Sequence, residues 1–312
     1  MRSITGIGET VLDIVFKEDR PQAAVPGGST FNAMISLGRT AGVRFPEVPI
    51  RMVSEVGDDH VADIITAFMA RNGVDSSAVT RRKDSKSHIS LAFLDADNNA
   101  RYSFYKDHAH AQLDPENLSG IRFCKDDLVL FGSYFAVNPL LRSFTEGLLR
   151  TAHDSGAILY YDINFRRPHR DQLAEILPRI EENCRLSDFV RGSSEDFYIL
   201  YGTDDPETVY RKYISPLCPE FICTCGPDPV HVFSHGRHMS FDAEKTHTVS
   251  TIGAGDNFNA GFVYGLLAED IRKDECAKLS EAQWAALVRT AGRFAAEACR
   301  SLDTYVPEGF RV

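Results

Sequence analysis

The sequence lacks an excess of positive charge and lacks long hydrophobic runs, and each absence excludes a class of protein. Its 34 Lys and Arg residues are outnumbered by 44 Asp and Glu residues, which gives a formal net charge of −10 at pH 7. Nucleic-acid-binding proteins normally present a basic face, so we expect no nucleic-acid partner. The longest largely apolar run, residues 128–137, has the length of a buried strand, so we expect no membrane-spanning segment.

Cysteine and histidine are present but follow no pattern of disulfides or zinc ligands. The seven cysteines are odd in number and scattered, at positions 124, 184, 218, 223, 225, 276 and 299. Only Cys223 and Cys225 are close, and a Cys-x-Cys pair on one face of a strand is typical of two small core residues. The ten histidines form no cluster with zinc spacing. We therefore expect free thiols and no structural metal bound by the protein.

The N-terminal residues show no signal-peptide pattern. Met1-Arg2-Ser3-Ile4 leads directly into a strand-like segment, without the hydrophobic region that a secretory signal needs. Together with the expected free thiols, this favours a cytoplasmic protein.

The sequence does contain a regular alternation of strand-like and helix-like segments. The strand-like segments lie at residues 4–8, 50–56, 127–131, 157–162, 188–192 and 221–225, with a late hairpin at 230–233 and 238–241. Helical patterns lie at residues 31–39, 61–72, 139–155, 169–183, 194–201, 207–214 and 281–302. This alternation predicts a wound α/β fold with a mostly parallel sheet. Such sheets bind ligands beyond the carboxyl ends of their strands, so the site is expected there.

Two segments depart from this alternation and show a period of two. Residues 10–25 and 87–106 each read as a hairpin, with turn residues at 17–21 and 95–99. Two hairpins from separate places in the chain can pair into a small sheet outside the main one. A flap of that kind can cover a cleft and exclude water from it.

The most informative stretch is residues 249–265, where a glycine turn opens into a helix rich in small residues. Gly253 and Gly255 weaken both helix and strand, and the helix that begins near Asp256 leaves backbone N–H groups without partners. These groups and the positive end of the helix dipole attract an anion. Asp256 would lie beside that anion, which is the pairing that phosphoryl transfer to an alcohol needs. From these four residues alone, however, a simple helix N-cap explains Asp256 as well.

A second glycine turn, at residues 26–30, precedes a helix that carries Asn32 in its first turn. Tight packing between a strand and a helix accounts for these glycines as well as ligand binding does. Asp13 lies between Leu12 and Ile14, which is an awkward place for a charge unless it has a partner. Such a carboxylate suits hydrogen bonding to sugar hydroxyls, although an exposed strand face would also hold it.

Taken together, the Gly-Ala-Gly-Asp turn at 253–256, the Gly27-Gly28 turn with Asn32, and the segment from Gly8 to Asp13 resemble the ribokinase-like (PfkB) family of carbohydrate kinases. The match covers nearly the whole chain, and the string Gly-Ala-Gly-Asp-x-Phe is specific. The resemblance implies one Rossmann-like α/β domain over residues 1–312, with a small β lid from about residues 10–25 and 87–106. It also implies ATP as the phosphoryl donor, accompanied by Mg²⁺.

The resemblance further implies roles for the residues around the acceptor. Asp256 matches the catalytic base of the family, and the turn before it matches the anion hole, which comprises Gly253, Ala254 and Gly255. Substrate-binding positions are matched by Asp13, Gly28, Asn32, Arg101, Asn164 and Arg166. Asn164 and Arg166 belong, with Asp162, to an Asp-x-Asn-x-Arg string common in the fructokinase and 2-keto-3-deoxygluconate kinase branches, where the planar fork of Arg166 suits substrate or phosphate.

On the nucleotide side, the resemblance implies contacts from Ser193, Thr224 and Gly226. The Asn-x-x-Glu string of the family, which helps to hold Mg²⁺ through waters, appears here as Ser-Ser-Glu-Asp at residues 193–196. The Asn is absent, and either Glu195 or Asp196 can serve as the acid. Ser250 stands where many members have an Asp linked to a monovalent-cation loop, which argues against potassium activation.

The resemblance makes an ATP-dependent sugar kinase, first of all a fructokinase, the leading hypothesis. Within the family, 2-keto-3-deoxygluconate kinase, ribokinase and nucleoside kinase remain alternatives, because a few side chains on the lid set that choice. A non-catalytic sugar or nucleotide sensor is the alternative of another class, which the changes at Ser193 and Ser250 favour and the intact Gly-Ala-Gly-Asp turn opposes. A lid with an apolar outer face would also suggest a homodimer formed through paired lids.

Overall fold

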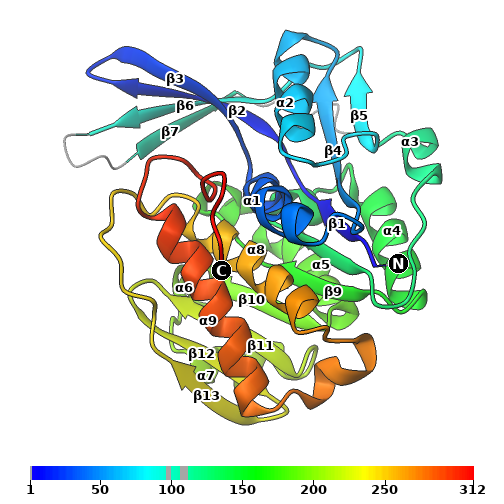
Figure 1. Ribbon diagram of the computed structural model, residues 1–312, viewed down its shortest axis with the longest axis vertical. Coiled ribbons are helices and arrows are strands. Elements are labelled where there is room, and N and C mark those ends of the chain that lie inside the picture. The colour runs from blue at the N-terminus through cyan, green and yellow to red at the C-terminus, as the bar shows by residue number, and fades with distance from the viewer. Residues whose placement is uncertain (1, 96–99, 106–111) are drawn as a thin grey trace.

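A mostly parallel sheet forms the frame of the molecule. The computed structural model describes residues 2–95, 100–105 and 112–312, and within these ranges nine strands form this sheet in the order β13-β12-β11-β10-β9-β8-β1-β4-β5 (Figure 1). They are β1 Ile4–Ile7, β4 Ile50–Gly57, β5 Val79–Arg82, β8 Leu128–Gly132, β9 Ile158–Asp162, β10 Phe189–Ser193, β11 Glu220–Cys225, β12 Asp228–Ser234 and β13 Arg237–Phe241. The pairs from β11 to β5 are parallel, and only β12 and β13 are added antiparallel. The predicted α/β class is therefore confirmed.

The central strands β8 and β9 are mostly apolar because helices cover both faces of the sheet. All positions of β8 and β9 are buried, including the consecutive Tyr160 and Tyr161, which point to opposite faces of the sheet. A parallel strand covered on both sides reads as a continuous apolar run rather than as an alternating one. This is why the sequence reveals these strands clearly.

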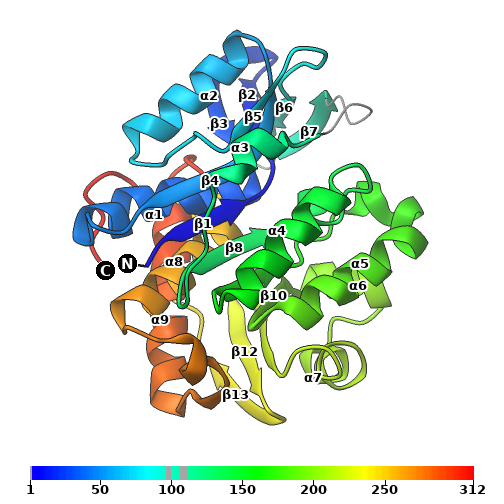
Figure 2. The same cartoon turned by 90° about the vertical axis from the view of Figure 1, so that its right-hand side faces the viewer.

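Helices pack on the two faces in separate groups (Figure 2). One face carries α1 Ser29–Arg44, α8 Ala254–Ala268 and α9 Glu281–Ala298, and the other carries α4 Arg142–Asp154, α5 Leu173–Leu186 and α6 Ser194–Tyr201. Each group has its own buried core. Phe262 and Trp284 belong to the first core, whereas Leu149 and Phe197 belong to the second. The N-termini of α1 and α8 come from opposite ends of the chain but lie on the same face, which places two glycine turns close together.

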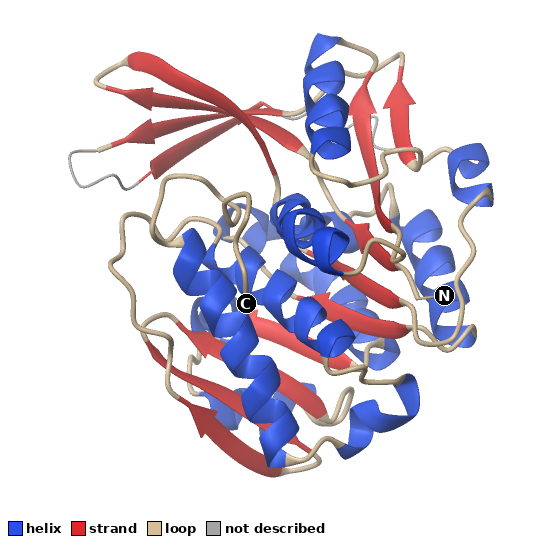
Figure 3. Cartoon of the chain, viewed as in Figure 1, coloured by secondary structure: helices blue, strands red, loops and turns tan. Residues whose placement is uncertain are grey.

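A smaller sheet extends from the main one, and its strands stand apart from the helices (Figure 3). It contains β2 Val11–Lys17, β3 Arg20–Gly27, β6 Ile89–Leu94 and β7 Ala100–Tyr105, in the order β3-β2-β6-β7. The pairs β2–β3 and β6–β7 are hairpins, and a parallel β2–β6 pair joins them. The two predicted hairpins therefore do pair into one sheet. Residues 96–99 of the predicted turn, and residue 106 at the end of the second hairpin, lie outside the described residues.

The structure differs from the sequence-based elements in a few places. Strand β5 was not predicted, because its two adjacent arginines, Arg81 and Arg82, interrupt the apolar pattern. The predicted helix at 207–214 is divided into α7 Pro206–Val209 and a π-helical turn at Tyr210–Ile214. Helix α3 Pro115–Ser119 was not predicted either, whereas α2 His60–Arg71 matches the helix expected at residues 61–72. Across the described ranges, no helix combines the length and apolar character that crossing a membrane requires.

Candidate active site

The N-terminus of α8 forms the centre of the candidate site. Gly253 caps this helix with a φ of +80°, a left-handed conformation that glycine adopts without strain. A Cβ added at Gly253 would stand 2.7 Å from the carbonyl oxygen of Thr304, so the close C-terminal segment also requires glycine. The Ala254 N–H donates to the Thr251 carbonyl at 3.2 Å. Among the residues predicted to form the anion hole, Gly255 lies in the first turn of α8, where its N–H is at the positive end of the helix dipole.

Two residues of α1 hold the Asp256 carboxylate. Ser29 Oγ donates to Oδ1 at 2.7 Å, and Asn32 Nδ2 donates to Oδ2 at 2.8 Å. Thr304 Oγ1 fixes Asn32 in turn, because it donates to Asn32 Oδ1 at 3.0 Å. The two glycine turns of the sequence thus meet at one carboxylate. The sequence analysis missed Ser29, although its position directly after Gly28 marks it as a first-turn residue of the same helix.

The surroundings of Asp256 change its acidity. Burial raises the pKa of this carboxyl above its usual range, and the negative charge of Asp162 adds to the rise. Hydrogen bonds from Ser29 and Asn32 and the positive charge of Arg166 act in the opposite direction. A carboxylate with a raised pKa is a stronger base than an exposed one, which suits the removal of a proton from a hydroxyl group.

Asp13 and Gly28 lie where the small sheet joins the main body. Asp13 is on β2, and Ser90 on the neighbouring β6 donates its hydroxyl hydrogen to the carboxylate. Gly28 caps α1 with a φ of +124°, and a Cβ there would collide with the Glu9 carbonyl oxygen. Glycine is thus required for the chain to pass from β3 into α1 beside Asp13.

The structure places Arg101 away from Asp13. In the small sheet, Asp13 pairs with Ser90, and Ser90 pairs with Phe104, whereas Arg101 pairs with Phe93. Arg101 is therefore three residues from the row of Asp13, roughly 10 Å along the strand. Its side chain is exposed.

The segment after β9 contributes Asn164 and Arg166. Asn164 has a φ of +38°, and its Nδ2 donates to Ser133 Oγ at 2.6 Å. Ser133, at the end of the neighbouring β8, also has a positive φ of +55°. Such conformations in two non-glycine residues at adjacent strand ends are typical of functional loops. Arg166 is exposed, and its charge reaches Asp256, whose pKa it lowers.

Arg191 in β10 is a site residue that the sequence analysis missed. Its side chain is 7% exposed, with Nη1 donating to Asp162 Oδ1 at 3.0 Å and Nη2 donating to Thr224 Oγ1 at 2.5 Å. Burial acts to lower the pKa of Arg191, but the attraction of Asp162 prevails and raises it, so the guanidinium stays charged. A Cβ added at Gly255 would stand 3.0 Å from Nη2. A buried positive charge thus lies directly behind the glycine turn, and an arginine within an apolar strand is the signal that marks it.

Asp162 faces the interior of this network. Besides its ion pair with Arg191, it accepts a hydrogen bond of 2.7 Å from Asn259 Nδ2. Asn259 Oδ1 accepts a bond of 3.0 Å from the Tyr160 hydroxyl. Within the Asp-x-Asn-x-Arg string, Asp162 therefore positions Arg191 rather than facing a ligand.

The predicted nucleotide residues follow the ends of β10 and β11. Ser193 caps α6, and its Oγ accepts a hydrogen bond of 3.2 Å from the Asp196 N–H. Thr224 is tied to Arg191, as described above. Gly226 has a φ of +63°, and a Cβ added there would meet nothing within 4 Å. Gly226 is thus required for the turn itself and leaves open space in front of it.

The two acids predicted to assist Mg²⁺ differ in availability. Asp196 is buried, and its Oδ2 accepts from both the N–H and the hydroxyl of Ser193, at 2.7 and 2.8 Å. Burial raises the pKa of this carboxyl. Glu195 is exposed. In the described part of the chain, no group of three or more His, Cys, Asp or Glu residues could hold a metal. One exposed carboxylate still fits Mg²⁺ that is bound mainly by phosphates and waters.

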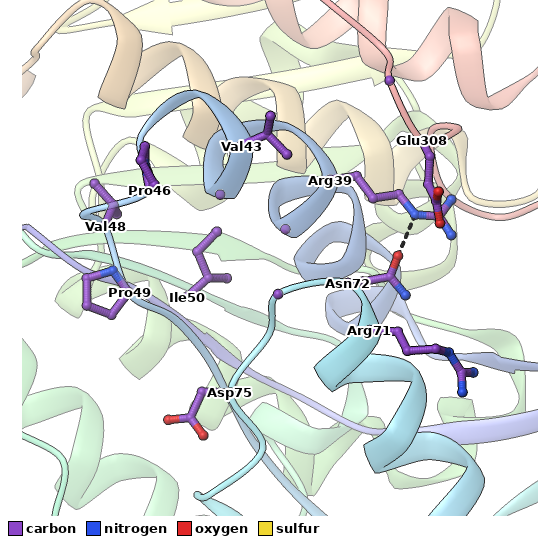
Figure 4. A pocket seen from close by; sticks show the side chains of 14 residues that line it. Arg39, Val43, Pro46, Val48, Pro49, Ile50, Arg71, Asn72, Asp75 and Glu308 are labelled. Carbon is purple, nitrogen blue, oxygen red and sulfur yellow. Dashed lines mark hydrogen bonds between the residues drawn. The ribbon is translucent and has the colours of Figure 1, made fainter.

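A cavity of about 630 Å³ lies outside this site (Figure 4). It is lined by Arg39 and Val43 of α1, by Ile50 at the start of β4, and by Arg71 at the end of α2. Arg39 Nε donates to Asn72 Oδ1 at 2.7 Å across one side of it. Because β4 begins here, this cavity lies at the amino end of the strand, and it includes none of the predicted site residues.

The fold and the arrangement around Asp256 fit a kinase that acts on an alcohol group. The carboxylate held at a helix N-terminus, beyond the carboxyl ends of parallel strands, has the geometry that phosphoryl transfer to a hydroxyl requires. Residues 1–308 match the pfkB family of carbohydrate kinases, and the chain belongs to that family. The predicted family and the predicted class, an ATP-dependent carbohydrate kinase, are both confirmed.

Individual relatives are distant but match over almost the whole chain. Probable fructokinase-2 of Arabidopsis thaliana is 25% identical over 313 residues, which cover 96% of this chain and 89% of the relative. Fructokinase-2 of Solanum lycopersicum is 24% identical over 290 residues, covering 89% and 86%.

Solved structures confirm the ribokinase-like fold. The fructokinase from Vibrio cholerae O395, bound to fructose, ADP and a calcium ion, has a TM-score of 0.81 at 20% identity, with 97% of this chain and 94% of that chain covered. The aminoimidazole riboside kinase from Salmonella enterica, complexed with aminoimidazole riboside and an ATP analogue, has a TM-score of 0.80 at 19% identity, with 97% and 95% covered.

Proposed function

We propose that this kinase transfers the γ-phosphoryl group of ATP to a primary hydroxyl of a free sugar, with fructose as the first candidate. The observation that carries the proposal is the Asp256 carboxylate, which Ser29 and Asn32 hold at the N-terminus of α8. A carboxylate in this position takes the proton of the acceptor hydroxyl, while amides and the helix dipole stabilise charge on the transferring group.

The proposed reaction is an in-line displacement. Asp256 removes the hydroxyl proton, the freed oxygen forms a bond to the γ-phosphorus, and the bond from that phosphorus to the bridging oxygen breaks as ADP leaves. The general-base and electrostatic terms together supply on the order of 10⁴-fold or more of the rate. The buried Arg191 guanidinium behind Gly255 adds positive charge to the same region.

The sugar is proposed to lie between the small sheet and the end of β9. Asp13, fixed by Ser90, accepts hydrogen bonds from sugar hydroxyls. Asn32 lies between this carboxylate and Asp256 in the proposed arrangement, with Gly28, Asn164 and Arg166 at the edges. Arg101 remains a candidate from the family resemblance alone, since the structure places it three residues away from the row of Asp13 in the small sheet.

ATP is proposed to bind over the ends of β10 and β11, against Ser193, Thr224 and Gly226. The neighbouring kinases solved with ADP or with an ATP analogue support this donor. Mg²⁺ would accompany the phosphates and neutralise part of their charge during transfer. Glu195 is the proposed acid that faces it through water, since Asp196 is held by Ser193.

Fructose is proposed because several curated relatives that match most of the chain are fructokinases. A coupled assay of ADP release against a panel of free sugars and nucleosides tests this choice. The highest kcat/KM is expected with fructose. A preference for 2-keto-3-deoxygluconate, ribose or a nucleoside would replace fructose as the substrate. Sugar binding without ADP release from any acceptor would instead support the sensor hypothesis.

A cytoplasmic location and a homodimer formed through the small sheets are also proposed. Phe93 on β6 and Tyr105 on β7 share one face of the small sheet and are 36% and 62% exposed, which supports an apolar contact surface there. A monomer mass in light scattering would exclude this dimer.

Ser250 is buried and its hydroxyl accepts a hydrogen bond of 3.2 Å from the Ile252 N–H, so it brings no negative charge that could bind potassium. Equal rates in potassium and sodium salts are therefore expected.

A further inference from the structure

Two cysteines lie together at the end of β11, next to the proposed nucleotide site. Their Sγ atoms are 4.0 Å apart. The pairing of β11 with β12 is irregular here, since Cys223 pairs with His231 whereas Cys225 already pairs with Asp228. Three residues of β11, 223–225, oppose four of β12, 228–231, so the extra residue lies in β12. Cys223 and Cys225 are two residues apart on β11, which places both thiols on the same face of the sheet.

The two thiols differ in their access to solvent. Cys223 is fully buried, as predicted for a core residue, whereas Cys225 is partly exposed and follows Thr224 into the turn at Gly226. All seven cysteines are free thiols. One sulfur can therefore meet a dissolved oxidant while the other is held beside it, protected from the solvent. This asymmetry is typical of a reactive cysteine with a resolving partner.

We propose that Cys223 and Cys225 form a reversible disulfide that weakens nucleotide binding, an inference that rests on the proposed function of the turn at 224–226. The oxidant is a hydroperoxide, and the reductant that reverses the reaction is a dithiol. A reversible disulfide is a regulatory device in proteins that otherwise keep their thiols reduced.

The reaction balances with one molecule of hydrogen peroxide. The Cys225 thiol first releases its proton, its thiolate attacks one peroxide oxygen, the O–O bond breaks, and the leaving hydroxide takes up the released proton to form water. The Cys223 sulfur then attacks the sulfenic sulfur of Cys225, the S–O bond breaks, and the second water leaves with the Cys223 proton. The two sulfurs lose two electrons in total, and the peroxide gains them.

The electrostatic surroundings agree with these roles. The Cys223 thiol, as hydrogen-bond partner, lowers the pKa of Cys225, and the Ser194 hydroxyl acts in the same direction. The same contact and burial raise the pKa of Cys223. Cys225 is thus the attacking thiolate, and Cys223 stays protonated until it resolves the sulfenic acid.

The disulfide would change the backbone at Thr224, which lies between the two cysteines. Cα atoms two residues apart in an extended strand are up to about 7 Å apart, whereas a disulfide joins Cα atoms about 5.5–6 Å apart. Closing the 4.0 Å gap therefore contracts the strand at Thr224. Thr224 Oγ1 accepts a hydrogen bond from Arg191, so the contraction disturbs both the nucleotide turn and the charge behind Gly255.

The test is to oxidise the whole reduced protein with a small excess of hydrogen peroxide and to measure three properties. These are the mass of the peptide that contains residues 223–225, the affinity for ADP by calorimetry, and the rate of sugar phosphorylation. We expect a peptide about two mass units lighter, ADP binding at least tenfold weaker, and recovery of both by dithiothreitol. Peroxide that leaves the peptide mass unchanged, or a disulfide that leaves ADP affinity unchanged, would overturn the proposal.

Matched variants separate this mechanism from general oxidation. Cys223→Ala should keep the activity of the reduced enzyme and lose the reversible disulfide. Cys124→Ser, which removes an exposed thiol before β8, should respond to peroxide as the wild type does. Two outcomes would contradict a disulfide between Cys223 and Cys225. One is a loss of peroxide sensitivity in Cys124→Ser, and the other is a dithiol-reversible loss of ADP binding that persists in Cys223→Ala. If the reduced protein binds ADP but phosphorylates no acceptor, the proposed function fails, whereas peptide mass and ADP affinity still decide the disulfide.

Discussion

The Asn32 side-chain amide donates a hydrogen bond of 2.8 Å to the Asp256 carboxylate, although 224 residues separate the two positions in the chain. The contact joins the first turn of α1 to the first turn of α8. It connects the segment that begins at the small sheet with the helix N-terminus proposed to hold the phosphoryl group. In the proposed mechanism, this pair of helices therefore positions both the substrate and the base.

Replacement of Asp256 by Asn should remove most of the activity without unfolding the protein. An amide of the same shape cannot accept the hydroxyl proton, so kcat should fall by about 10³-fold or more. Initial rates and ADP calorimetry would measure this, with affinity for ADP expected to stay within about threefold. Asp242→Asn, at an exposed carboxylate outside the site, is the control and should keep full activity. Near wild-type turnover of Asp256→Asn would refute the assignment of the base.

Removal of the Asn32 amide should move the acid side of the pH–rate profile to higher pH. The hydrogen bond from Asn32 lowers the pKa of Asp256, so its loss raises that pKa further. Because the base must be deprotonated, kcat/KM should then begin to fall at a higher pH as the solution is acidified. In Asn32→Ala the shift should be about one pH unit, since a hydrogen bond to a charged group is worth about 1.5–3 kcal/mol and water replaces part of it.

Thr304→Val gives a graded version of the same experiment. This variant leaves Asn32 in place but removes the hydroxyl that fixes it. A smaller shift in the same direction is expected from its pH–rate profile. An unchanged acid limb in both variants, or a shift to lower pH, would show that Asp256 does not set the profile.

Arg191 should be essential for stability as long as Asp162 keeps its charge. In Arg191→Met, Asp162 would be left as an unpaired buried carboxylate, which costs about 3–5 kcal/mol of unfolding free energy. The double variant with Asp162→Asn should recover much of that loss, and urea unfolding at neutral pH measures both. Arg150→Met, which breaks the exposed Arg150–Glu146 pair, is the control and should change stability little. An equal loss in the single and double variants would contradict the charge argument.

Gly253→Ala should reduce activity much more than the replacement, elsewhere in the chain, of a glycine that has the same backbone conformation. Gly253 and Gly236 both have a φ of +80°, so alanine costs about 1–2 kcal/mol at either position. Only at Gly253 would the new Cβ approach a backbone oxygen, that of Thr304 at 2.7 Å, whereas nothing lies within 4 Å at Gly236. Thermal unfolding should show a loss in both variants, but kcat should fall about 100-fold or more only in Gly253→Ala. Equal activities of the two variants would show that the turn at Gly253 does not contribute to catalysis.

The sequence alone determined the elements whose signals are local. The buried strands β8 and β9 appear as apolar runs, the hairpins of the small sheet appear through their period of two, and the Gly-Ala-Gly-Asp turn predicts an anion site. These signals arise from backbone geometry and from burial, which each short segment expresses by itself. The sequence also gave the family, since its turn motifs are specific.

Only the tertiary structure decided which of these segments meet. It brought Ser29 to Asp256, directed Asp162 inward to Arg191, placed Arg101 away from Asp13 and held Asp196 in the cap of α6. Each of these facts depends on the order of the strands and on the direction of a side chain across a helix pair. Contacts between distant segments follow from how the whole core packs, and no local pattern carries that information.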